Sequence, residues 1–197
     1  MSDRTHHRPM TPGAGFFAEI AGGSDPAMLR EAGDLAATVL VRGARSSDDP
    51  ALAERIVHLA ETEGLETLAE VWSGAPADTL AGSLWRLFLL RSWVHADPER
   101  VAKEYDAGQR RVDVARVVAG VADPPGPEEL RAMVDEVLRG IAGGDFAVTL
   151  FRAAAFARIV AAGRAALGVP HEEITRMLVL SEQLEAAGQG EMRDALG

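Results

Sequence analysis

Histidine is the residue type in this sequence best suited to binding a transition metal, because the chain contains no cysteine. His6 and His7 stand near the N-terminus, whereas His58, His95 and His171 fall on three different expected helices or at their ends. Three imidazoles that meet inside a helical bundle can hold a catalytic zinc with an open fourth position. The chain lacks the Glu-x-x-His spacing of di-iron bundles, and isolated histidines are more often surface or helix-end residues. We therefore expect no metal and no cofactor, and keep a three-histidine site as a minor variant.

Patterns for nucleophilic catalysis and phosphate binding are absent from the sequence. No Gly-x-Ser-x-Gly elbow occurs, and Gly82 and Ser83 fall inside an expected helix. No Gly-x-x-x-x-Gly-Lys loop occurs, and Lys103 is the single lysine. The 30 acidic and 20 basic residues give a net charge of −10, which argues against nucleic-acid binding. We expect no nucleic-acid partner, and a non-enzymatic role is favoured over an enzymatic one.

Aromatic and cationic side chains gather in the middle of the chain. All three tryptophans lie between positions 72 and 93, and Arg86 and Arg91 interrupt the most apolar stretch. These arginines can reach the helix edge, pair with buried acids or bind an anion between helices. Tryptophan and arginine together are typical of binding hot spots, although packing in the core is the favoured explanation of the aromatic residues. The candidate ligand-binding or interface residues are Trp85, Arg86, Leu89, Arg91, Trp93 and His95.

The elements that position these residues are expected to be helices. Alanine and arginine are abundant and favour helices, whereas residues typical of strands are scarce. A helix-capping residue followed by proline predicts a helix start at each of three positions, Pro26, Pro50 and Pro98. The expected helices are 26–42, 50–60, 65–72, 79–96, 98–108, 110–121, 127–142, 146–167 and 171–187. We predict an all-α, single-domain bundle of seven to nine helices.

Two of the helices, 79–96 and 146–167, are expected to be central. The first is apolar around most of its circumference, which is typical of a helix buried in a core or an oligomer interface. The second is rich in alanine, which allows neighbouring helices to approach closely. These two helices therefore form the expected centre of the bundle.

The chain is expected to comprise an irregular arm, 1–25, and one helical domain, 26–197. Glycines and prolines interrupt the arm, although its apolar segment 16–20 is expected to dock on the body or on a partner chain. The Pro-rich connection 123–127 lies inside the domain, because a division there would leave the smaller part with much open apolar surface. No secretory signal or membrane span is evident, so a cytoplasmic location is expected.

The stretch 79–108, above all 84–93 and 97–105, resembles small all-helical proteins of high-GC bacteria. That group carries a transcription-related label, as an RNA polymerase subunit. The resemblance extends over most of the chain, rests on packing residues and includes no catalytic motif. It implies an all-helical fold and a transcription-related role, but it assigns a function to no individual residue.

Two classes of function follow from these features. The first is a non-enzymatic interaction or regulatory protein that forms a homodimer, because Arg86 and Arg91 project about 140° apart and leave helix 79–96 without one wide polar face. The second is a ligand-binding or enzymatic bundle with a pocket near Arg86, Arg91, Trp93 and His95. A flat apolar patch would favour the first class, and polar groups that converge in an apolar cleft would favour the second.

Overall fold

The computed structural model describes residues 26–42, 65–111, 126–138 and 146–195. These residues form seven helices and no strand, which confirms the all-α class. The helices are α2 (Pro26–Arg42), α4 (Leu65–Trp72), α5 (Leu80–Ala96), α6 (Pro98–Gln109), α7 (Pro127–Leu138), α8 (Phe146–Ala166) and α9 (His171–Ala195). The arm 1–25, the expected helix 50–60 and nearly all of 110–121 lie outside the described residues.

Side-chain caps and prolines set the helix starts where the sequence predicts them. The Asp97 carboxylate accepts a hydrogen bond from the Arg100 backbone N–H over 3.0 Å, and Pro98 occupies the first turn of α6. Thr79 caps α5 in the same way, since its hydroxyl oxygen accepts from the Gly82 N–H over 3.0 Å. These local interactions explain why the starts of α5 and α6 could be read from the sequence.

The C-terminal helix is longer than predicted. We expected an end near residue 187, but α9 continues to Ala195 through Gly188 and Gly190. The added turns are held by a contact far along the chain, because Arg42 of α2 forms a two-pronged ion pair with the buried carboxylate of Glu191. Tertiary contact therefore outweighs the low helix propensity of the two glycines.

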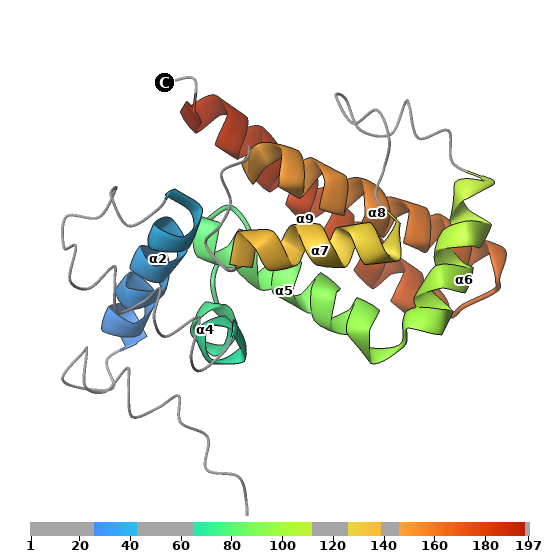
Figure 1. The fold of residues 1–197 in the computed structure, drawn as a ribbon, viewed down its shortest axis with the longest axis horizontal. Coiled ribbons are helices and arrows are strands. Elements are labelled where there is room, and N and C mark those ends of the chain that lie inside the picture. The colour runs from blue at the N-terminus through green and yellow to red at the C-terminus, as the bar shows by residue number, and fades with distance from the viewer. Residues whose placement is uncertain (1–25, 43–64, 112–125, 139–145, 196–197) are drawn as a thin grey trace, which may run out of the picture.

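α6, α7 and α9 pack against α8, whereas α2 and α4 pack against α5 (Figure 1). α8 and α9 lie side by side as an antiparallel pair, α6 crosses the C-terminal half of α8, and α2 and α4 lie at the other end of the molecule. α8 has buried positions around nearly its whole circumference. α5 differs, because Leu84, Leu87 and Val94 are buried whereas Leu89 is 41% exposed. Thus α8 is enclosed and α5 is covered on one side.

The crossing of α6 and α8 depends on two glycines. A Cβ on Gly163 would stand 1.7 Å from the carbonyl oxygen of Glu104, and one on Gly108 would stand 1.9 Å from that of Ile159. Neither position can therefore hold a side chain at the present separation. The two backbones touch, and Glu104 and Arg164 are held beside this contact, where they form a buried ion pair.

One described helix, α8, is long and apolar enough to cross a membrane. Yet 72% of its most apolar window is buried inside the structure, as in the core helix of a soluble protein. The sequence-based expectation of no span rested on the lack of a long run of large apolar residues. The alanine-rich α8 passes the length and composition test without such a run.

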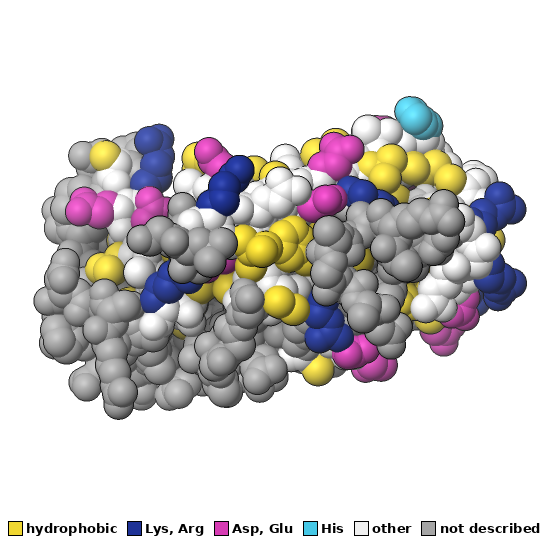
Figure 2. Space-filling view, turned by 90° about the horizontal axis from the view of Figure 1, so that it is seen from above, with side chains coloured by type: hydrophobic (Ala, Val, Ile, Leu, Met, Phe, Trp, Pro, Cys, Tyr) yellow, Lys and Arg dark blue, Asp and Glu magenta, His cyan; other side chains and the backbone are white. Residues whose placement is uncertain are grey.

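Charged groups of both signs are interspersed on the face shown in Figure 2. Acidic and basic side chains alternate there with hydrophobic ones, and the described part of this face shows no broad basic field. A duplex-binding surface needs several clustered cations. This face of the described molecule therefore lacks the charge pattern of a nucleic-acid-binding protein.

Candidate functional site

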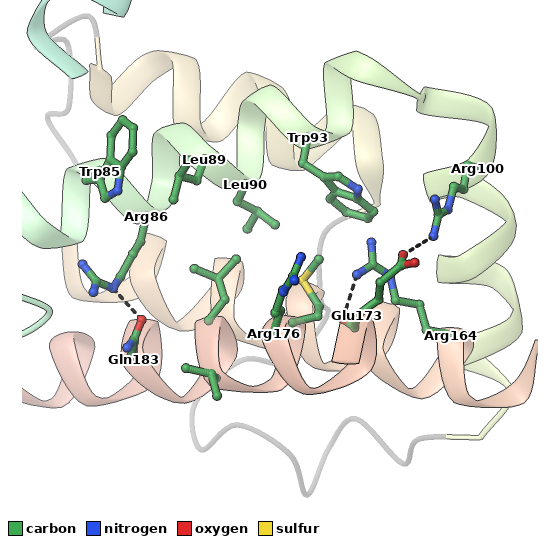
Figure 3. A pocket seen from close by; sticks show the side chains of 13 residues that line it. Trp85, Arg86, Leu89, Leu90, Trp93, Arg100, Arg164, Glu173, Arg176 and Gln183 are labelled. Carbon is green, nitrogen blue, oxygen red and sulfur yellow. Dashed lines mark hydrogen bonds and ion pairs between the residues drawn. The ribbon is translucent and has the colours of Figure 1, made fainter. Parts of the chain in front are cut away.

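A groove of about 650 Å³ lies between α5 and α9 (Figure 3). Its volume falls within the roughly 300–1,000 Å³ that is typical of small-molecule sites. The walls are mainly apolar, charged or amide side chains lie at both ends, and Arg176 lies between the ends in Figure 3. The apolar lining consists of Trp85, Leu89, Leu90, Trp93, Met177, Val179 and Leu180, and the polar lining of Arg86, Arg100, Arg164, Glu173, Arg176 and Gln183.

Helical spacing places the groove residues on facing stripes. Trp85, Leu89 and Trp93 are four positions apart, so they share one face of α5. On α9, Met177 and Leu180 are three positions apart and lie opposite. Figure 3 shows Trp93 directed from α5 toward α9, whereas the Trp85 ring stands on the side of α5 away from α9. The groove is thus lined by large side chains from both helices.

One end of the groove is closed by a network of ion pairs. The Glu104 carboxylate accepts hydrogen bonds from Arg100 Nε over 2.7 Å and from Arg164 Nε over 2.8 Å. Arg100 Nη2 also donates to Glu173 Oε2 over 2.7 Å, and Arg164 Nη1 donates to the Glu173 carbonyl oxygen over 3.0 Å. These carboxylates, Glu104 foremost, raise the pKa of Arg100. The positive charges of the two arginines are thus balanced by the negative charges of the two glutamates.

An aromatic contact joins this network to the wall of the groove. The Arg164 guanidinium carbon lies 4.7 Å from the ring centroid of Trp93, which is cation–π distance. Arg164 is itself buried, at 5% exposure. The Trp93 ring is therefore fixed between the apolar groove and the charged end.

The other end of the groove carries Arg86 without a carboxylate partner. Arg86 Nε donates to Gln183 Oε1 over 2.7 Å, and Nη1 donates to the Gly82 carbonyl oxygen over 2.8 Å. Both acceptors are neutral, and no described carboxylate forms an ion pair with Arg86. Burial lowers the pKa of Arg86, and the charge of Asp78 opposes part of that shift. Arginine still keeps its proton at neutral pH, so this end of the groove is cationic.

The structure brings four of the six candidate residues into the groove. Trp85, Arg86, Leu89 and Trp93 line it, whereas Arg91 and His95 do not. Arg91 follows Arg86 by five positions and so projects about 140° away from it. His95 is exposed at the end of α5. The pocket predicted near Arg86 and Trp93 is thus present, but two of its four predicted members lie elsewhere.

Sequence reasoning missed the opposite wall and the ion-paired end. In the sequence, Met177 and Leu180 are apolar positions of the last expected helix, and no pattern distinguishes Gln183 or Glu173. Nothing in a single sequence says that α9 packs opposite α5. The available signal was the shared apolar spacing of the two helices.

The three-histidine variant is not tested by the structure, because His58 lies outside the described residues. His95 and His171 are both exposed, on α5 and α9. The described part of the chain contains no group of three or more side chains that could hold a metal ion. The three-histidine variant therefore stays a prediction.

No protein-family model, curated protein or solved structure shows a significant match to this chain. We therefore infer the function from the groove.

Proposed function

We propose that this chain is a ligand-binding helical protein, located in the cytoplasm, whose binding site is the groove between α5 and α9. The observation that carries the proposal is a cavity of about 650 Å³ with mainly apolar walls, in which Arg86 and Gln183 lie at one end and Arg164 and Glu173 at the other. Apolar clefts with a few placed polar groups are the usual form of small-molecule sites. This matches the second class of function expected from the sequence.

Binding is favoured over catalysis by the state of the polar groups. Among the described residues that line the groove, Glu173 is the only carboxylate, and it is ion-paired with Arg100. A general acid or base needs a proton that it can exchange with a substrate. Beside that paired carboxylate, the groove is lined by arginines and one amide. Arginine and amide side chains can orient a ligand through hydrogen bonds.

The proposal is tested with a neutral apolar probe, N-phenylnaphthylamine, whose fluorescence rises in apolar sites. We expect saturable enhancement with the wild-type chain and loss of binding in Leu89→Glu, because Leu89 lines the groove. Leu178→Glu is the matched control, since Leu178 is 39% exposed on α9 but does not line the groove. Absence of wild-type binding, or equal binding by both variants, would overturn the proposal.

Self-association is a second candidate, favoured by exposed apolar side chains. Leu89, Leu178 and Val179 are 41%, 39% and 43% exposed, and a second copy of the chain would cover them. This is the homodimer expected from the sequence.

Light scattering at micromolar concentration tests the homodimer. We expect a mass near twice 20.9 kDa. A chain that is a folded monomer at that concentration, or a monomer that stays fully folded after dilution to nanomolar concentration, would exclude an obligate dimer.

A further inference from the structure

The two ends of the groove differ in charge. At the Trp93 end, Arg100 and Arg164 are matched by Glu104 and Glu173. Arg176 lines the groove as well, but it is exposed and paired with Glu172. Among the described lining cations, Arg86 is the one that makes no ion pair. Within the described residues, the groove therefore has one cation whose hydrogen-bond partners are all neutral, and it lies at the end opposite the network (Figure 3).

Two hydrogen bonds hold the Arg86 side chain in place, although no described carboxylate forms an ion pair with it. Its bonds to Gln183 of α9 and to the Gly82 carbonyl fix the guanidinium between the two helices. These bonds leave other N–H groups of the guanidinium unused within the described residues. A partly buried cation without an anion is unfavourable, so an anionic group bound there gains a charge-assisted hydrogen bond.

The space between the two ends suits an elongated apolar body. Arg86 and Trp93 are about 10 Å apart along the axis of α5, because seven residues separate them at 1.5 Å each. Leu89, Leu90 and Leu180 line the intervening part. A ligand that occupies the groove thus meets the Arg86 cation first, then aliphatic side chains beside the ion-paired Arg176, and finally the Trp93 ring.

We infer that the ligand is a carboxylate with an apolar chain, whose head pairs with Arg86 and whose tail extends toward Trp93. This inference rests on the proposed function, because it names the class of ligand for the same groove. The planar guanidinium matches a carboxylate with two parallel hydrogen bonds. A dianionic phosphate would need more cations than one, in a chain whose net charge is −10 and beside Asp78.

The test compares ligands with one tail and different heads. Decanoate, decanol, decyltrimethylammonium and decyl phosphate are titrated into the full chain by calorimetry, below their micelle concentrations. We expect decanoate to bind about tenfold more tightly than decanol, the size of effect that one charge-assisted hydrogen bond gives. We expect the ammonium ligand to bind most weakly and decyl phosphate no better than decanoate.

The matched variants are Arg86→Gln and Arg91→Gln, two neutralisations on the same helix. Arg86→Gln is expected to bring decanoate down to the affinity of decanol and to leave decanol binding in place. Arg91→Gln is expected to keep the preference, because Arg91 does not line the groove. Circular dichroism checks that both variants are folded. The comparison of head groups uses the wild-type chain and does not depend on whether a variant folds.

The outcomes separate the two proposals. Equal binding of decanoate and decanol by the wild type, tighter binding of decyl phosphate, or a preference that survives in folded Arg86→Gln would overturn the carboxylate inference and leave the groove as a binding site. Failure of every ligand to bind would overturn the proposed function itself.

Discussion

The α6–α8 crossing and the α5–α9 groove are two opposite ways of packing helices within one chain. At the crossing, Gly108 and Gly163 let the backbones touch, and a buried ion pair lies beside the contact. At the groove, a cavity of about 650 Å³ remains between α5 and α9, and Trp85, Leu89 and Trp93 are among the residues that line it. Glycine thus permits the close backbone contact at the crossing, whereas large side chains line the cavity.

The same comparison applies to charge. The arginines near the crossing, Arg100 and Arg164, are neutralised by Glu104 and Glu173, as a structural role requires. Arg86, at the far end of the groove, has only neutral partners. The difference separates cations that hold the fold together from one that is available to a ligand.

The largest expected effect is that of Glu104→Ala on stability. Removing this carboxylate leaves Arg164 buried without its partner, and breaking a buried pair costs about 3–5 kcal/mol in the free energy of unfolding. The control is Glu172→Ala, which breaks the exposed pair with Arg176 and should cost less than about 1 kcal/mol. Urea unfolding of the three chains measures the difference. Similar losses for both variants would show that the buried network has no special role.

A smaller loss of stability is expected when a substitution forces apart the close backbone contact between α6 and α8. In Gly163→Ala the new methyl group overlaps the Glu104 carbonyl oxygen, so α6 and α8 must separate, at a cost of about 2 kcal/mol. Gly190→Ala is the control, because nothing lies within 4 Å of its Cβ position in α9. That variant should be more stable than the wild type by up to about 1 kcal/mol, since alanine favours helices. Thermal unfolding that ranks the two variants in the reverse order would refute the glycine-mediated crossing.

The smallest expected effect on stability is that of Leu89→Ala. This side chain is 41% exposed at the groove, so its truncation should cost only about 1 kcal/mol. The same change removes part of the groove wall and should weaken binding of the naphthylamine probe. Unfolding and probe titrations are run side by side on one preparation. A large loss of stability with unchanged probe binding would place Leu89 in the core instead of the binding site.

Local signals made most of the described helices predictable. The Asp97–Pro98 start of α6 and the Gly168 end of α8 are each set by residues a few positions apart. Gly168 adopts a φ of 71°, and the Val169 N–H bonds back to the Arg164 carbonyl oxygen, which is a standard helix stop. Such features depend on neighbours in the chain and can be read from the sequence.

The remaining features depend on pairs of residues far apart in the chain. α9 extends past residue 187 with Glu191 held by Arg42, 149 positions away. The groove needs α5 opposite α9, and that arrangement also decides why Arg86 lines it while Arg91 does not. A helical pattern predicts which residues share a face, but it does not say which helix that face meets. The α5 half of the site was therefore predictable, and the α9 half was not.

Quenching of tryptophan fluorescence by decanoate brominated at its terminal carbon is the decisive measurement for the groove as a ligand site. Bromine quenches only nearby rings, and both Trp85 and Trp93 line the cavity. We predict quenching that saturates, that unlabelled decanoate reverses, and that Leu89→Glu abolishes. Quenching that rises linearly without saturation, or that is unchanged in Leu89→Glu, would contradict a binding site between α5 and α9.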